Sequence, residues 1–347
     1  MSGPKIIIQC SVMPLSHSSI SSMAALPSQA GPGGSRPAAD LERGWLTVAA
    51  LDTATPTQLA SYSNACGVAK SYCLVAPGTA AFVGHESTAG NLQYFYGSGT
   101  SYAAPLVSGA AALVWEAFPY FNNDLVRQTL LGTATDLGAP GPDAVFGYGL
   151  LNVGKAVLGP GRFDWGDVTV NVDQTGLNST WRNPISGAGG LVKTGVGALV
   201  LTGTNTYSGG TTVNAGALSI SADSNLGALS GGLTLAQGGT LKTTASLATN
   251  RTIYLDAGGG SFDTASGTAL SINGVITGTG GLTKNVSGDL QLNAANTYTG
   301  DTTVTNGTLL VNGDQSAARG ATTVSGTSTL GGNGIIGGNV LMNDATT

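Results

Sequence analysis

Hydrophobic residues recur at alternate positions in the second half of the chain. Leu199 and Leu201 form one such pair, and Leu218 and Ile220 form another. An aliphatic side chain at every second position is typical of a strand that buries one face. Gly, Asn and Asp lie between these segments and suit corners that require a positive φ. From Gly187 onward, the pattern therefore predicts many short β-strands joined by tight turns.

A duplicated unit lies within this region, and its two copies are offset by a constant 91 positions. So many matches at one offset indicate repeats that stack, because no single unit could bury its apolar face alone. We therefore predict a parallel β-helix (β-solenoid), with a β-sandwich or barrel as the alternative. The matching positions are Gly190 and Gly281, Leu191 and Leu282, Lys193 and Lys284, Leu199 and Leu290, Leu201 and Leu292, Asn205 and Asn296, Tyr207 and Tyr298, Val213 and Val304, and Gly216 and Gly307.

The first half has a mixed pattern that predicts strands and two helices. Residues 103–115 are apolar and Ala-rich, which predicts a buried helix. Asn122 or Asn123 can cap a second helix over residues 125–131. Short apolar runs at residues 46–51 and 74–79 predict buried strands, and the polar segment 52–64 predicts a loop.

One serine lies at the start of the first predicted helix, in the sequence GSGTSYAAP (residues 97–105). Gly99 and Thr100 allow a sharp turn that leaves the Ser101 side chain accessible. We expect Pro105 in the first helical turn, where it would remove no helical hydrogen bond. A helix N-terminus favours negative charge, so Ser101 is a candidate nucleophile with oxyanion donors beside it. The alternative is a Gly-Ser loop that only caps a core helix.

This stretch resembles the serine motif of the subtilisin-like serine proteases, the subtilases. The segments LTVAALD (46–52), YSN (62–64), VAPG (75–78) and FGYGLLN (146–152) also resemble subtilase sequence, in the same order. The resemblance covers Trp45 to Leu158 and implies the C-terminal α/β part of a subtilisin-like fold. It implies that Ser101 attacks peptide bonds and that its own backbone N–H helps to hold the oxyanion.

The Asp and His motifs that complete a subtilase triad are absent from the sequence. His17 has no following glycine, and His85 lies where the family has a variable loop. We predict that neither is the general base. Gly90-Asn91 resembles the family's oxyanion-hole step but lies too close to Ser101 along the chain. Because loss of the triad lowers turnover of subtilisin on the order of a million-fold, we predict that the chain as written is not a working protease.

Three cysteines are present, Cys10, Cys66 and Cys73. The short spacing of Cys66 and Cys73 allows a small disulfide loop, and two unpaired buried thiols are the alternative. Similar exported subtilases carry cysteines at these places, so the resemblance favours the disulfide. Cys10 is left over.

The repeat LVLTGTNTYSGGTTVNAGAL (199–218) and its copy LQLNAANTYTGDTTVTNGTL (290–309) are similar to the autotransporter-associated repeat of Gram-negative type V secreted proteins. This resemblance implies a passenger β-helix that is secreted or displayed at the outer membrane. It also implies a membrane β-barrel translocator as a partner in the full-length protein. Neither that barrel nor a signal peptide is recognisable in the sequence. We therefore expect an internal piece of a longer protein, cut at both ends.

Composition narrows the remaining functions. Of 347 residues, 55 are Gly, 41% are hydrophobic and only 9% are charged, which argues against disorder and suits a repetitive β structure. The net charge of -5 argues against nucleic acid as a partner. No apolar run has the length of a transmembrane helix. We predict no cofactor and no metal site.

Four parts follow from these patterns. Residues 1–44 are unassigned, either disordered or a misplaced start; 45–158 are the subtilase segment; 159–186 are a linker or the first rungs; and 187–347 are the repeat β-helix. Two functions fit. The first is a fragment of an exported subtilisin-like serine endopeptidase acting on proteins or peptides. The second is a non-enzymatic surface β-helix of the adhesin type that carries an inactive remnant.

Overall fold

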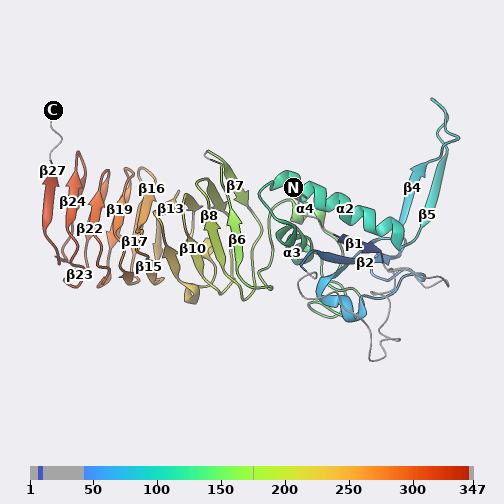
Figure 1. The fold of residues 1–347 in the computed structure, drawn as a ribbon, viewed down its shortest axis with the longest axis horizontal. Helices are drawn as coiled ribbons and strands as arrows, with labels where there is room; N and C mark the ends of the chain where they lie inside the picture. The colour runs from blue at the N-terminus through green and yellow to red at the C-terminus, as the bar shows by residue number, and fades with distance from the viewer. Residues whose placement is uncertain (1–6, 11–42, 175, 344–347) are drawn as a thin grey trace. The chain divides into compact units, whose positions relative to one another are not determined.

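The structure is a computed structural model that describes residues 7–10, 43–174 and 176–343. It divides into two compact units, Met1–Pro160 and Gly161–Thr347. The first unit mixes strands and helices, whereas short strands dominate the second (Figure 1).

A small parallel sheet organises the first unit. Ala49 and Val75 pair across its two longer strands, and both side chains are fully buried. The strand predicted at 46–51 is confirmed, and the one predicted at 74–79 is shorter than expected. The first strand was not predicted, because the apolar run that contains it is short. In order, the sheet contains β1 (Ile7–Cys10), β2 (Trp45–Leu51) and β3 (Cys73–Pro77), and the 3-10 helix η1 (Gly67–Tyr72) leads into β3.

Both predicted helices form, but the first begins earlier than expected. Because it starts at Thr100, Pro105 lies in the second turn, and the prediction of a first-turn proline is wrong. Pro105 lacks the N–H that would bond to the carbonyl four residues earlier, that of Ser101. Asn122 caps the second helix as predicted, since its Oδ1 accepts a hydrogen bond from Leu125 N at 2.8 Å. The helices are α2 (Thr100–Ala117), α3 (Asn123–Thr133) and α4 (Val153–Ala156).

An antiparallel hairpin separates β3 from α2. It consists of β4 (Thr79–Val83) and β5 (Tyr94–Ser98), which pair from Thr79 with Ser98 to Val83 with Tyr94. We call residues 79–98 the arm. Figure 1 shows the arm projecting away from α2, and the sequence predicted only a turn and a loop in this place.

The second unit is a parallel β-solenoid of about eight turns. Its strands pair only in parallel within the described residues, which excludes the alternative of a sandwich or an antiparallel barrel. The first sheet contains β6 (Val168–Asn171), β8 (Leu191–Thr194), β10 (Thr211–Val213), β12 (Leu233–Leu235), β15 (Ile253–Leu255) and β18 (Ile276–Gly278).

The second sheet contains β7 (Asn178–Trp181), β9 (Ala198–Leu201), β11 (Ala217–Ile220), β13 (Gly239–Thr243), β16 (Gly260–Thr264), β19 (Leu282–Lys284), β21 (Thr302–Val304), β24 (Thr322–Ser325) and β27 (Val340–Asn343). The third sheet contains β14 (Leu247–Thr249), β17 (Ala269–Ile272), β20 (Asp289–Leu292), β22 (Thr308–Val311) and β25 (Thr329–Gly331). A further pair joins β23 (Asp314–Gln315) to β26 (Ile335–Ile336). Two 3-10 helices, η2 (Asp223–Leu226) and η3 (Leu229–Gly231), lie between β11 and β12.

Inward side chains form a continuous core along this coil. Leu199, Leu201, Leu218 and Ile220 are all buried, as their alternation predicted. At the N-terminal end, Phe163 is fully buried, and the segment 159–186 supplies β6 and β7 of the stack.

The two copies of the repeat lie on different faces of the solenoid. Strands β8 and β10 of the first copy belong to the first sheet, whereas the equivalent β19 and β21 belong to the second. Along the first sheet, the successive partners of Leu191 are Thr211, Leu233, Ile253 and Ile276. Four turns therefore end just before Leu282, the equivalent of Leu191. The 91-residue offset between the two copies therefore equals four turns of the coil plus the step from one sheet to the next.

Candidate active site

Ser101 is the second residue of α2 and its side chain is exposed. No acidic or basic side chain lies in the first helical turn. The helix dipole at this end favours a developing negative charge. Behind Ser101, Ala103, Ala104 and Val107 are buried and hold the helix against the core. The predicted position of Ser101 at a helix N-terminus is present in the structure.

Gly78 joins the segments that surround this helix start. Its N–H donates to the Leu51 carbonyl at 3.0 Å, and its carbonyl accepts from Gly99 N and from the Tyr62 hydroxyl, both at 2.8 Å. A Cβ at Gly78 would lie 2.4 Å from the Tyr62 hydroxyl and 2.6 Å from the Ala50 Cβ, so only glycine fits. Three segments distant in the sequence, at Leu51, Tyr62 and Gly99, thus meet at Gly78.

Aromatic rings run from the residue after Ser101 along one face of the arm. The rings of Tyr102 and Phe82 are nearly parallel, with centroids 6.2 Å apart, and Phe82 stacks on Phe95 at 6.4 Å. Two glycines make room for these rings. A Cβ at Gly97 would lie 2.2 Å from Tyr102 ring atoms, and one at Gly84 would lie 2.1 Å from the Phe95 ring. Sequence reasoning missed this stack, although its alternating aromatic and glycine positions were visible.

The structure does not bring His85 or Asn91 to Ser101. His85 is exposed in the turn beyond β4, six residues after Thr79, which is about 20 Å of extended chain from the base of the arm. A general base must lie about 3 Å from the proton that it removes. Gly90-Asn91 belongs to the same turn, where Thr88 and Asn91 exchange backbone hydrogen bonds. His17 lies outside the described residues.

Among the residues that the structure describes, no group of three or more His, Cys, Asp and Glu side chains could hold a metal ion. No helix in the described part of the chain is long and apolar enough to cross a membrane.

Cys66 and Cys73 are joined by a disulfide with a Cα–Cα distance of 5.8 Å. Both residues are fully buried in the core of the first unit, together with Leu51, Ala69 and Val75. The bridge closes the loop that contains η1 and fixes the start of β3. It therefore supports the strand that carries the chain to Gly78.

Two buried lysines lie inside the solenoid, in equivalent positions of the repeat. Lys193 Nζ donates to the carbonyls of Thr194, Gly195 and Ala215, at 3.1, 2.6 and 2.9 Å. Burial lowers the pKa of Lys193 to about 8. Lys284 Nζ donates to the carbonyls of Val286 and Asn306. Burial also lowers the pKa of Lys284, and the charges of two nearby aspartates, Asp263 and Asp289, oppose this shift.

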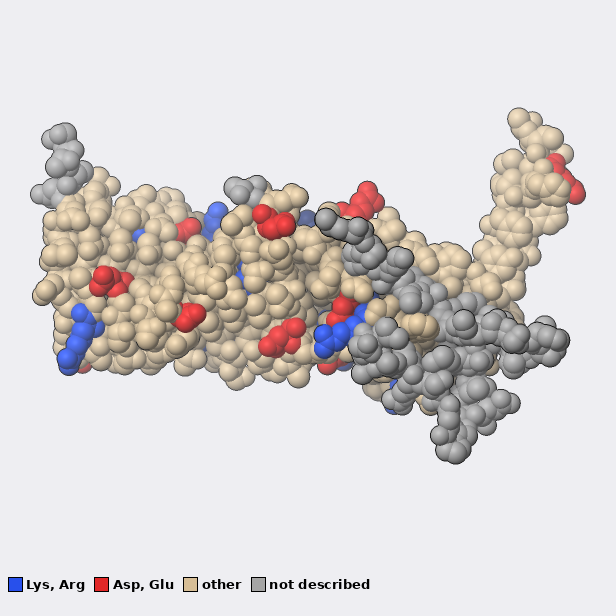
Figure 2. Space-filling model, in the orientation of Figure 1, with Lys and Arg blue, Asp and Glu red and all other residues tan. Residues whose placement is uncertain are grey.

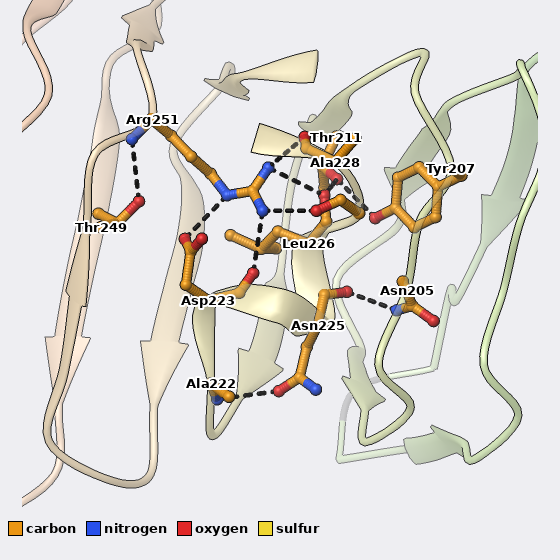
Figure 3. Close-up of polar contacts among 11 residues, drawn as sticks. Asn205, Tyr207, Thr211, Ala222, Asp223, Asn225, Leu226, Ala228, Thr249 and Arg251 are labelled. Carbon is orange, nitrogen blue, oxygen red and sulfur yellow. Dashed lines mark hydrogen bonds and ion pairs between the residues drawn. The ribbon is translucent and has the colours of Figure 1, made fainter. Parts of the chain in front are cut away.

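A buried arginine fastens η2 and η3 to the coil (Figure 3). The Arg251 guanidinium is 2% exposed and pairs with Asp223 Oδ1 at 2.8 Å. It also donates to the carbonyls of Asp223, Gly227 and Ala228, at 3.0, 2.6 and 2.7 Å. In the same view, the Tyr207 hydroxyl bonds to Thr211 Oγ1 at 2.6 Å. These groups have structural partners and point to no ligand.

Comparison with known proteins finds a family match in each of the two parts of the chain. Residues 17–149 match the Subtilase family, and residues 191–220 and 282–311 match the Passenger-associated-transport-repeat. The chain joins a subtilase segment to passenger-associated repeats. The family match begins at residue 17, inside the segment 1–44 that sequence patterns left unassigned, and residues 17–42 lie outside the described residues.

Three curated relatives are similar to parts of this chain. The Neisserial autotransporter lipoprotein NalP of Neisseria meningitidis serogroup B is 40% identical over 192 residues, covering 52% of this chain and 17% of the relative. An extracellular serine protease of Serratia marcescens is 36% identical over 215 residues, covering 47% and 21%. The adhesin BmaC autotransporter of Brucella suis is 43% identical over 121 residues, covering 35% and 4%. The chain thus spans about a fifth of the length of the first two relatives.

Proposed function

We propose that this chain is part of an exported subtilisin-like serine endopeptidase. Ser101 is the nucleophile that attacks the peptide carbonyl, and the backbone N–H of Ser101 helps to hold the oxyanion. The observation that supports this is an exposed serine in the first turn of α2, in the segment that matches the Subtilase family. Two relatives, one named an autotransporter lipoprotein and the other an extracellular serine protease, support the same function.

The β-solenoid is, in this proposal, the passenger stalk of the enzyme. Protein or peptide is the substrate, and the chain is secreted or displayed at the outer membrane through a translocator in the full-length protein. The repeat matches and the autotransporter names of two relatives support this assignment. No nucleic acid and no cofactor takes part.

The chain as written is proposed to be a poor catalyst, because neither His17 nor His85 carries the family's His motif. A fluorophosphonate probe tests both statements on the purified chain. We expect slow labelling that Ser101→Ala abolishes and that Ser108→Ala, at another exposed serine of α2, leaves unchanged. Labelling that persists in Ser101→Ala would refute the nucleophile. Fast labelling that His17→Ala abolishes would refute the inactivity.

A second candidate function is a non-catalytic surface β-solenoid of the adhesin type. The observation that favours it is the 43% identity to the Brucella suis adhesin over 121 residues. Translation of the genomic DNA upstream of this chain in all three forward frames separates the two. Subtilase-type Asp and His motifs in any frame support the endopeptidase, and their absence from every frame supports the adhesin.

A further inference from the structure

The arm exposes an unusual amount of apolar surface beside Ser101. Its side chains lie on both faces of a two-stranded ribbon, so neither face is a core. Large exposed apolar patches on soluble proteins mark interaction sites more often than chance exposure. The exposed fractions are Phe82 44%, Val83 51%, Leu92 53%, Tyr94 59%, Phe95 45% and Tyr96 77%.

The two faces of the ribbon differ in construction. Directly paired residues share a face, so Phe82 and Phe95 lie on one side and the pair Val83 and Tyr94 lies on the other. The first side continues the ring of Tyr102, which is adjacent to Ser101 in the chain. We call the rings of Tyr102, Phe82 and Phe95 the aromatic track. It begins one residue from the candidate nucleophile and extends outward along the arm.

The edges of the arm are also available for pairing. Within the described residues, β4 and β5 pair only with each other. Exposed edge strands usually carry lysine or proline to prevent pairing with other chains. Residues 79–98 contain no Lys, Arg or Pro, and Glu86 is their sole acidic residue. Figure 2 accordingly shows the arm as uncharged apart from one acidic patch near its tip.

We propose that the arm binds the polypeptide substrate, as an extended segment with apolar side chains. The segment adds its backbone to an edge of the ribbon, and its side chains stack on the aromatic track. A nearly uncharged arm selects against charged segments, because these would lose hydration without gaining a counter-ion. This inference rests on the proposed function for the word substrate, and the binding itself needs no catalysis.

The test measures peptide binding without cleavage. The chain carries Ser101→Ala, and the probe is a fluorescein-labelled decapeptide of Leu, Phe and Ala with Ser spacers. A matched decapeptide replaces Leu and Phe by Asn. We expect the apolar peptide to bind about tenfold more tightly than the Asn peptide, by fluorescence anisotropy. Adding Phe82→Ser or Phe95→Ser, both on the face that continues the Tyr102 ring, should each weaken binding of the apolar peptide by about fivefold or more.

Tyr254→Ser is the matched control, because Tyr254 is 45% exposed on the solenoid, far along the chain from the arm. It should change binding by less than about twofold. Circular dichroism melts confirm that each variant folds. Equal binding by the arm variants, or no binding to the Ser101→Ala chain, overturns the proposal.

Two alternative occupants of the arm, a second copy of the chain and a lipid surface, are distinguished by further measurements on the same variants. A Ser101→Ala dimer that Phe95→Ser converts to a monomer in sedimentation would assign the arm to contacts between copies. Arm-dependent binding to phosphatidylcholine vesicles without peptide binding would assign it to lipid. Either result overturns the proposal. Peptide binding by the Ser101→Ala chain, together with no fluorophosphonate labelling of the parent chain, would instead support peptide binding by the arm and count against the endopeptidase.

Discussion

Lys193 in β8 and Lys284 in β19 place the same buried ammonium inside the solenoid, four turns and one face apart. Each side chain is fully buried and each Nζ donates to backbone carbonyls. In the second sheet, Lys284 takes an inward position between Phe262 and Val304, where the stack is otherwise apolar. The duplication therefore preserved an internal hydrogen-bonding device while moving it around the coil.

The depressed lysine pKa predicts an alkaline rise in stability. Burial lowers the pKa of Lys193 to about 8 in the folded chain, against 10.5 for an ordinary lysine. Between these pH values the unfolded chain holds more protons, so the free energy of unfolding rises with pH, whereas below pH 8 this group adds no slope. We expect a rise of about 1 to 2 kcal/mol from pH 8 to 10. The three carbonyl acceptors oppose loss of the proton and so keep the rise at the lower end of this range. Urea unfolding followed by circular dichroism measures it.

The control for this prediction is a pair of variants. Lys193→Met removes the titrating group, so its stability should vary less over the same pH range than that of the parent. Lys242→Met, at an exposed lysine of the same solenoid, should keep the parent's slope. A parent curve that is flat or that falls between pH 8 and 10 would show that the buried ammonium does not release its proton.

The two repeat asparagines provide a second prediction. Asn205 Oδ1 accepts from Ile185 N and its Nδ2 donates to the Asn225 carbonyl. Asn296 Oδ1 accepts from Ile276 N, but its Nδ2 has no partner within the described residues. Asn205→Ala therefore leaves two buried groups unpaired, whereas Asn296→Ala leaves one. We expect Asn205→Ala to lower the free energy of unfolding by about 1 kcal/mol more.

The neighbouring tyrosines serve as the internal reference for this comparison. The Tyr207 and Tyr298 hydroxyls each bond to a threonine, at 2.6 and 2.7 Å. Tyr207→Phe and Tyr298→Phe should therefore cost the same within about 0.5 kcal/mol. Urea unfolding of the four variants decides the matter, and an equal cost for the two asparagines would contradict the prediction.

Much of the solenoid was predictable because its rules are local. Alternating residues such as Leu218 and Ile220 identify the strands, and asparagines stacked on successive turns can join their amides in a ladder along the coil. The ladder from Asn273 through Asn293 to Asn312 is present, with amide hydrogen bonds of 2.8 Å. The face that each copy occupies was not predictable. It depends on how many residues each turn consumes, and insertions such as η2 and η3 change that number without altering the strand pattern.

The candidate site divides in the same way. Ser101 was predictable, because small residues and a helix start are adjacent in the chain. The convergence of Tyr62, Gly78 and Gly99 was not, because it depends on contacts between distant segments. Pro105 was placed wrongly, because the helix begins at Thr100, three residues before the apolar run at 103–115 that predicted it. The arm was expected as a variable loop, and only its aromatic content hinted at a paired ribbon.

The disulfide provides a third prediction, on the stability of the first unit. Closing the short loop between Cys66 and Cys73 lowers the entropy of the unfolded chain, which raises the free energy of unfolding by about 2 to 3 kcal/mol. Reductant should therefore lower the melting temperature of this unit in the parent chain. The double variant Cys66→Ala/Cys73→Ala should melt at a lower temperature and be insensitive to reductant. A parent chain whose melting is unaffected by reductant, with reduction verified by thiol labelling, would contradict the expected stabilisation.

The arginine clamp provides the last prediction. Arg251 is nearly fully buried and holds η2 and η3 by an ion pair with Asp223 and several carbonyl hydrogen bonds. Removing the buried guanidinium leaves several carbonyls and the half-buried Asp223 carboxylate without their partner. Arg251→Ala should therefore lower the free energy of unfolding of this region by about 2 to 4 kcal/mol. Hydrogen exchange over residues 223–231 should accelerate by at least about tenfold, while exchange in β21 and β22 changes little. Arg182→Ala, at an exposed arginine of the same unit, is the control and should leave exchange over 223–231 unchanged. Unaltered protection of 223–231 in Arg251→Ala would mean that the loop is held by its backbone contacts alone.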